Sequence, residues 1–265
     1  MRRSVSSRLL VEIVEPADVV LAVAVSSRDL ATEAISFWLD GVELWATELD
    51  SGHGTRLHRV RDLSPGMFSV MYDAVVDGRA APPPVDEIDL VEYLRPSRYC
   101  ESDRLAGFAH SEFRGLEGRD LLNAVSSWVG TRVFYVSGSS RPIDGAVSTL
   151  LAQEGVCRDF AHLVIAILRA RGVPARLVAV YAPGLEPMDF HAVVEAFVDG
   201  EWLVVDATCL APRRGLVRIA TGRDAADTAF LTSLRGSVVL SSLEVTAVMD
   251  SPLPDDDVTA ASVLG

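Results

Sequence analysis

Short runs of alternating apolar and polar residues fill the first eighty positions of the chain. Alternation with a period of two is typical of β-strands, and these runs are rich in Val, Phe and Trp. The dipeptide Asp40-Gly41 between two of the runs favours a tight hairpin turn. The predicted strands span residues 9–14, 19–25, 34–39, 42–47, 54–61 and 67–76. We therefore expect residues 1–80 to form a small all-β, sandwich-like domain.

The pattern changes after the proline-rich sequence GRAAPPP at residues 78–84, which favours an extended chain. We assign residues 81–97 to a linker. Apolar residues then recur every three or four positions, as in helices that bury one face. Predicted helices span residues 98–110, 118–130, 143–153 and 157–169, and predicted strands span 176–182, 190–198, 201–207 and 236–248. Residues 98–250 are expected to form an α+β core with helices packed on an antiparallel sheet, and residues 251–265 a flexible acidic tail.

Cys157 stands at the predicted start of the last of these helices, after Gly155 and Val156. The positive end of a helix dipole and the free N–H groups of its first turn stabilise a thiolate at such a position. The same N–H groups can stabilise an oxyanion. Position alone leaves two interpretations open, because cysteine is also a common small residue of protein cores.

A nucleophilic thiol needs a base, and helix geometry excludes two neighbours of Cys157 from this role. At about 100° per residue, His162 points about 140° away from Cys157 around the helix, so it is expected to pack among the helices. Asp159 points about 200° away, and its place in the first turn suits an acid that stabilises the helix dipole. The base must therefore come from another part of the chain.

His191 opens a predicted strand that is joined by an Asp-Gly turn to a second strand ending at Asp206. A two-residue turn pairs Val193 with Asp206, so His191 and Asp206 share one face of the hairpin. Their backbones are then diagonal neighbours about 7 Å apart. A carboxylate there can orient one imidazole nitrogen and leave the other for a thiol. Cys157, His191 and Asp206 are therefore the predicted catalytic residues, although each one alone also has a structural explanation.

The segments around these three residues resemble the motifs of bacterial transglutaminase-like proteins. The sequence GVCRDFAH is similar to the family's nucleophile motif, DFHAVVE to its histidine strand, and WLVVDAT to its Asp-Pro-Thr strand. Ala207 stands where the family commonly has proline, which leaves the acid in place. The motifs keep the family's order and spacing across residues 100–250. The N-terminal β-rich part resembles a domain that is often attached in bacterial members.

The resemblance implies a papain-like α+β core and thiol-dependent acyl transfer through an acyl-enzyme. Hydrolysis, as in a cysteine peptidase or amidase, is the preferred hypothesis. The alternatives are transglutaminase-type transfer to a primary amine, amide formation on a carrier-bound substrate, and a non-catalytic binding module with the same fold. The expected partner is a peptide, a protein or another amide-bearing substrate. The resemblance implies no cofactor and no metal.

Some features of the expected site stay open at this stage. The second donor of the oxyanion hole is not identified by any motif, and Gln153, Trp128 and Tyr135 are all candidates. The sequence GRDAAD at residues 222–227 is either a functional loop or, as we prefer, an Asp-capped turn. The three aspartates at residues 255–257 are assigned to the solvated tail rather than to a metal site.

Composition narrows the choice of partner and compartment. The 265 residues carry 24 basic side chains, all of them arginine, against 37 acidic ones, for a formal net charge of −13. Such a chain is not expected to bind nucleic acid or an anionic membrane, and it offers no lysine amine of its own as an acyl acceptor. Its apolar runs are shorter than the ~18 residues of a membrane span. The three cysteines, Cys100, Cys157 and Cys209, are scattered along the chain, which suggests free thiols in a reducing compartment. We therefore expect a cytoplasmic protein. The sequence does not indicate an oligomeric state.

Overall fold

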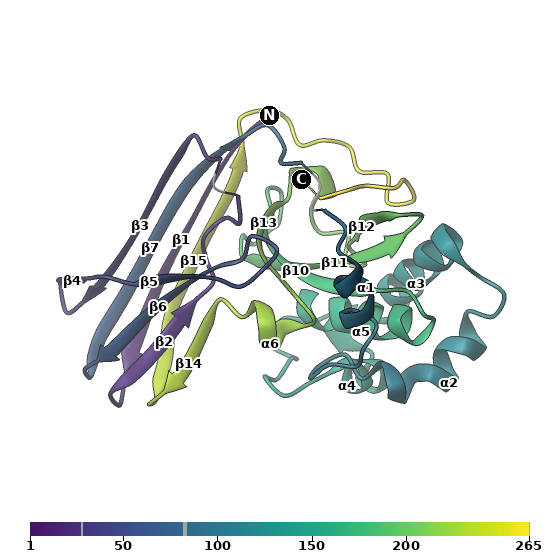
Figure 1. Ribbon diagram of the computed structural model, residues 1–265, viewed down its shortest axis with the longest axis horizontal. Coiled ribbons are helices and arrows are strands. Elements are labelled where there is room, and N and C mark those ends of the chain that lie inside the picture. The colour runs from purple at the N-terminus through teal and green to yellow at the C-terminus, as the bar shows by residue number, and fades with distance from the viewer. Residues whose placement is uncertain (28, 82–83, 265) are drawn as a thin grey trace.

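Three large sheets, one sheet of two short strands and a cluster of helices make up the computed structural model, which describes residues 1–27, 29–81 and 84–264. Two packed sheets lie on one side of the molecule, the helices lie on the other side, and the third sheet lies between them (Figure 1). This arrangement confirms the predicted α+β class with a β-rich N-terminal region. Within the described ranges, no helix is long and apolar enough to cross a membrane. The same residues contain no group of three or more His, Cys, Asp or Glu side chains that could hold a metal ion.

The two packed sheets form a β-sandwich. The first sheet contains, in order, β15 (Val238–Met249), β1 (Arg2–Ile13), β7 (Gly66–Asp77), β3 (Thr32–Leu39) and β4 (Val42–Leu44). The second contains β14 (Leu231–Arg235), β2 (Ala17–Leu21), β6 (Arg56–Leu63) and β5 (Thr47–Asp50). Alternate residues of β1, among them Leu9 and Val11, are buried in the core of the sandwich. The period of two in the sequence therefore has the expected cause, which is one buried face per strand.

Two strands of the sandwich come from the far end of the chain. β15 pairs with β1, and β14 pairs with β2, both antiparallel. Residues 231–249 therefore belong to the sandwich, whereas the sequence placed them in the core at 98–250. The alternation in β15 correctly predicted a strand over most of its length. Its partner lies at the opposite end of the chain, and a local pattern does not specify such a partner.

The central sheet has the order β12 (Glu201–Val205), β11 (Phe190–Val198), β10 (Ala175–Tyr181), β13 (Val217–Gly222). One face of β10 packs against both halves of the molecule, because Leu177 lies in the helical core and Tyr181 lies in the core of the sandwich. The Tyr181 hydroxyl donates a hydrogen bond of 2.8 Å to the carbonyl oxygen of Val23 in the sandwich. This shared face holds the sandwich against the core.

Helices α2 (Ser102–Glu112), α3 (Gly118–Arg132) and α4 (Ala146–Ala152) surround α5 (Cys157–Ala170). Nearly all of α5 is buried against these helices and against β10 and β11, so it is the central helix of the core. The segment 81–97, expected to be a linker, contains the short helix α1 (Glu87–Glu92). The carboxylate of Asp86 caps α1 by accepting a hydrogen bond from the N–H of Ile88. Residues 82–83 of the proline-rich sequence lie outside the described ranges.

The C-terminal segment is ordered against the core, in contrast to the flexible tail that the sequence predicted. The Arg213 guanidinium donates to the carboxylate of Asp256 at 2.9 Å. The Val204 N–H on the edge strand β12 donates to the carbonyl oxygen of Ser262 at 2.8 Å. Leu264 is buried against the central sheet. Acidic composition suggested a free tail, but these specific partners fix the segment.

Candidate active site

The β11–β12 hairpin brings His191 and Asp206 together. The turn residues Asp199 and Gly200 both have positive φ, 55° and 86°, which the preferred two-residue hairpin turn requires. The strands pair in the predicted register, with Val198 opposite Glu201 and each later pair following in step. Asp206 directly follows β12, and its Oδ2 lies 2.7 Å from Nε2 of His191. The prediction that the two side chains share one face is therefore confirmed.

The carboxylate of Asp206 has a different partner for each oxygen. While Oδ2 contacts His191, Oδ1 accepts hydrogen bonds from the N–H and the hydroxyl of Thr208 at 2.9 and 2.6 Å. Burial would raise the pKa of Asp206, but His191 and Thr208 outweigh it and hold the pKa below its ordinary value. The Asp-Ala-Thr turn therefore fixes an ionised carboxylate beside the imidazole.

Cys157 is the first residue of α5, as predicted, and its side chain is partly exposed. Asp159 closes the first turn, because its carboxylate accepts the N–H of Val156 at 2.9 Å and its own N–H donates to the Val156 carbonyl at 2.8 Å. This reciprocal cap confirms the role assigned to Asp159. A Cβ atom on Gly155 would lie only 2.6 Å from the Cβ of Asp159, so the tight approach to the helix start requires glycine.

The second nitrogen of His191 is left for the thiol. His191 Nδ1 has no hydrogen-bond partner at ordinary distance among the described residues, and the imidazole interacts with the Cys157 side chain. Burial alone would lower the pKa of His191, but the charge and hydrogen bond of Asp206, together with Cys157, raise it to about 10. The imidazole is therefore protonated at neutral pH, and an imidazolium stabilises a neighbouring thiolate.

The other two thiols lack this environment. Cys100 is fully buried, and burial raises the pKa of its thiol far above the ordinary value. Cys209 is exposed, and partial burial together with the charge of Asp206 raises its pKa. Both thiols therefore stay protonated at neutral pH.

His162 packs among the helices, as predicted. It is completely buried, its ring stacks on Tyr99 with centroids 5.1 Å apart, and its Nε2 accepts the N–H of Ala225 at 3.1 Å. Burial lowers the pKa of His162 to about 3, so the ring is neutral. Asp224 caps the short helix α6 (Ala225–Thr228) through the N–H of Ala226. Residues 222–227 thus contain the Asp-capped turn that we preferred.

Among the three candidate oxyanion donors, Tyr135 is the one that the described contacts join to Cys157. It lies on the short strand β8 (Phe134–Tyr135), which pairs in parallel with β9 (Glu154–Gly155) just before the thiol. Its hydroxyl interacts with the backbone and the side chain of Cys157. Trp128 instead donates its indole N–H to Glu112 at 2.8 Å, and Gln153 is exposed at the end of α4.

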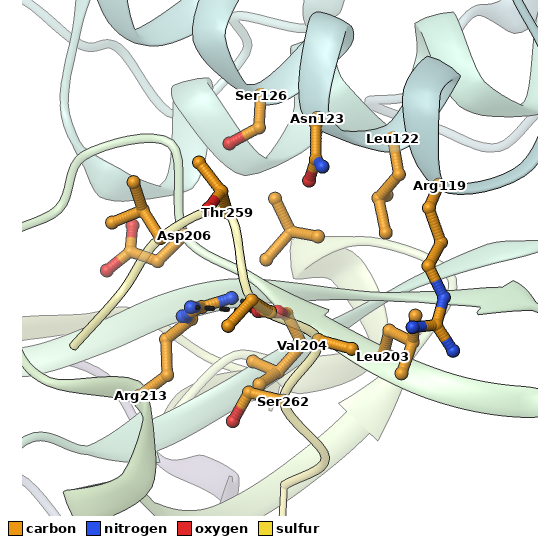
Figure 2. A pocket seen from close by; sticks show the side chains of 14 residues that line it. Arg119, Leu122, Asn123, Ser126, Leu203, Val204, Asp206, Arg213, Thr259 and Ser262 are labelled. Carbon is orange, nitrogen blue, oxygen red and sulfur yellow. Dashed lines mark hydrogen bonds between the residues drawn. The ribbon is translucent and has the colours of Figure 1, made fainter.

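A small cavity lies beside Asp206, between α3 and the C-terminal segment (Figure 2). Asn123 and Ser126 line it from the helix, and Thr259 and Ser262 line it from the segment. Its volume is about 30 Å³, which is close to that of one water molecule. Neither Cys157 nor His191 lines it, so it is not where a substrate would meet the thiol.

A cysteine at the start of a buried helix, facing a His–Asp pair on an antiparallel hairpin, defines a protein with a transglutaminase-like core. The family model for the transglutaminase-like superfamily matches residues 114–207, which include all three residues. The fold is similar to the crystal structure of a proposed cysteine protease from Cytophaga hutchinsonii, with a TM-score of 0.87 and a sequence identity of 32%. The similarity covers 97% of this chain and 93% of that one. The chain belongs to the transglutaminase-like superfamily, which supports thiol-dependent acyl transfer as its general chemistry.

Curated mycobacterial relatives match part of the chain. An uncharacterised protein of Mycobacterium leprae is 26% identical over 171 residues, which are 61% of this chain and 60% of that protein. An uncharacterised protein of Mycobacterium tuberculosis is 36% identical over 139 residues, 46% of this chain and 43% of that protein. The chain therefore spans less than two thirds of the length of these relatives.

Proposed function

We propose that the protein hydrolyses an amide bond through an acyl-enzyme, with Cys157 as nucleophile, His191 as proton carrier and Asp206 as the residue that orients His191. The observation that carries the proposal is the contact of 2.7 Å between Nε2 of His191 and Oδ2 of Asp206, which leaves Nδ1 for the thiol. The ionised Asp206 and the raised pKa of His191 favour a thiolate–imidazolium pair at neutral pH.

The proposed reaction has two steps. The thiolate of Cys157 attacks the carbonyl carbon of the amide, the C–N bond breaks, and the imidazolium of His191 gives its proton to the leaving amine. Water then attacks the thioester, its proton passes to His191, and the acid leaves as the thiolate is restored. The backbone N–H of Cys157 stabilises the oxyanion in both steps, because the N–H groups of a helix's first turn have no partner within the helix.

Hydrolysis is favoured over transfer to an amine by the Cytophaga hutchinsonii protein, a proposed cysteine protease to which the chain is similar over 97% of its length. Since all three cysteines are free thiols, we propose that the enzyme works in a reducing compartment such as the cytoplasm. Product release from a casein substrate in buffer alone is the expected result. A product that forms only with an added fluorescent primary amine would contradict hydrolysis and support transfer.

Alkylation of Cys157 tests the thiolate without knowledge of the substrate. At pH 7 we expect iodoacetamide to label Cys157 faster than the exposed Cys209, as measured by mass spectrometry of digested protein. Replacing His191 by Ala should slow the labelling of Cys157 by about 10-fold or more, because the thiolate loses its counter-ion. Equal labelling rates at the two cysteines, unchanged by His191→Ala, would support a non-catalytic binding module instead.

Tyr135 is proposed as the second oxyanion donor. Burial and the neighbouring Cys157 raise its pKa to about 12, so its hydroxyl keeps the proton that it must donate. Tyr135→Phe should lower kcat by about 100-fold and change KM little, since the lost hydrogen bond matters most in the transition state. Gln153→Ala is the matched control and should leave kcat nearly unchanged. If Gln153→Ala lowered kcat strongly and Tyr135→Phe did not, Gln153 would be the second oxyanion donor instead.

A further inference from the structure

A carboxylate that the proposed mechanism does not use lies close to the imidazole of His191. Asp189 directly precedes β11 and stands two residues before His191. Its side chain is exposed, and its Oδ1 accepts the N–H of Phe190 at 2.7 Å, which fixes the carboxylate at the start of the strand. Asp189 acts electrostatically on both His191 and Tyr135, the two side chains that flank Cys157.

No arginine of the described chain neutralises this group. Asp189 takes part in none of the ion pairs found among the described residues. The cation next to the thiol in sequence, Arg158, is directed elsewhere, because its guanidinium donates to the hydroxyl of Ser140 and to the carbonyl of Arg141. The sequence contains no lysine that could take this place.

The charges of the site therefore do not balance. The imidazolium of His191 stands beside two carboxylates, Asp206 and Asp189, so negative charge is in excess even before the thiol ionises. Asp206 is buried behind the imidazole and already bonded through both oxygens. Asp189 is exposed, and its neighbours Met188 and Phe190 are apolar side chains. Burial raises the pKa of Asp189, and the N–H of Phe190 and the charge of His191 oppose this rise. An approaching substrate thus meets an exposed carboxylate that is paired with no arginine of the described ranges.

We propose that Asp189 is a specificity residue that selects substrates with a positively charged side chain, of the arginine or lysine type, close to the reacting carbonyl group. A cation there gains an attraction that no arginine of the described ranges already takes up, and a substrate with the same charge as Asp189 is repelled. The proposal deepens the proposed function, since it rests on Cys157 being the reacting group. Asp189 itself takes no part in bond making or breaking.

Charged thiol reagents measure this preference at Cys157 directly. The probes are three methanethiosulfonates, two charged ones of similar size with a cationic trimethylammonium-ethyl or an anionic sulfonato-ethyl group, and a neutral one with a methyl group. Each transfers its thioalkyl group to the thiolate and releases methanesulfinate. A Cys209→Ser background removes the exposed competing thiol. Rates for the charged reagents are divided by the neutral rate, which cancels any change in the amount of thiolate.

The cationic reagent should react faster than the anionic one, and Asp189→Asn should reduce this ratio by about 3- to 10-fold, as expected for one charge at short range in a partly hydrated site. Asp189→Arg should reverse the preference. Glu186→Gln removes the same charge from an exposed residue of the same loop and is the matched control. A ratio that Asp189→Asn leaves unchanged, or that Glu186→Gln changes equally, overturns the assignment. The proposed function would still stand in that case if iodoacetamide labels Cys157 rapidly and His191→Ala slows this labelling.

Discussion

Replacing Cys157 by Ala should lower kcat/KM for amide hydrolysis by at least about 10⁴-fold, because the acyl-enzyme cannot form without the thiolate. The folded state should hardly change. Cys157 is partly exposed, and the cap that starts α5 is made by Val156 and Asp159 instead. The measurement is product release from casein, with thermal unfolding of the same preparations followed by circular dichroism.

Two further variants test whether the loss of activity is specific to the thiol of Cys157. Cys157→Ser keeps nearly the same side-chain size but replaces the thiol by a hydroxyl, which ionises much less easily. This variant should therefore be almost as inactive as Cys157→Ala. Cys209→Ser removes a thiol whose Sγ lies 3.5 Å from the backbone oxygen of Asp206, yet it should retain activity. Hydrolysis that survives in Cys157→Ala at more than about 1% of the original rate would exclude Cys157 as the nucleophile.

The largest expected effect on stability comes from Glu195, a fully buried acid on the histidine strand. It pairs with Arg176 at 2.8 Å and with Arg218 at 2.5 Å. Arg176 is also fully buried, and its guanidinium lies 3.9 Å from the centre of the Trp202 ring. Glu195→Ala should destabilise the protein by about 3–5 kcal/mol, because two arginines lose their shared counter-charge inside the core. The melting temperature should fall by about 2–4 °C for each kcal/mol.

The charge of Glu195 also predicts how this stabilisation depends on pH. Burial would raise the pKa of Glu195, but Arg218 and Arg176 outweigh it and lower the pKa below the ordinary value of 4.5. A lowered pKa in the folded state means that the stabilisation is fully present above about pH 4.5 and is lost as the pH falls through the folded-state value. The difference in melting temperature between wild type and Glu195→Gln should therefore shrink on acidification.

An exposed ion pair provides the control. Arg2 and Asp77 form a pair at 2.8 Å on the surface, with about half of each side chain exposed. Asp77→Asn should change the melting temperature little, since solvent screens this pair. If Glu195→Ala is no more destabilising than Asp77→Asn, the buried cluster contributes no more than a surface pair does.

Local patterns were sufficient for the elements that carry the site. The spacing of three and four after Cys157 marked α5, since a helix buried on most sides needs apolar residues throughout its length. The Asp-Gly turn fixed the register of β11 and β12, because only one pairing fits a two-residue loop with positive φ. From that register the proximity of His191 and Asp206 followed directly.

Long-range pairing was not available from the sequence. The alternation of β15 predicted a strand but not its partner β1, and so the division at residue 250 was misplaced. The acidic C-terminal segment was expected to be flexible, yet Arg213 and the edge of β12 hold it. The linker contains α1, whose six residues are too few to show a clear helical period.

The sequence by itself placed Cys157 at a helix start and His191 and Asp206 on one face of a hairpin, because neighbouring residues set the geometry of each element. Only the tertiary structure decided that the side chain of Tyr135 lies near Cys157 and that the carboxylate of Asp189 has no arginine partner within the described ranges. Tyr135 reaches the thiol because β8 pairs with β9, two strands of two residues each that carry no periodic signal. Asp189 has no arginine partner because the arginines of the described ranges that form ion pairs do so with other acids, and that is a property of the folded structure.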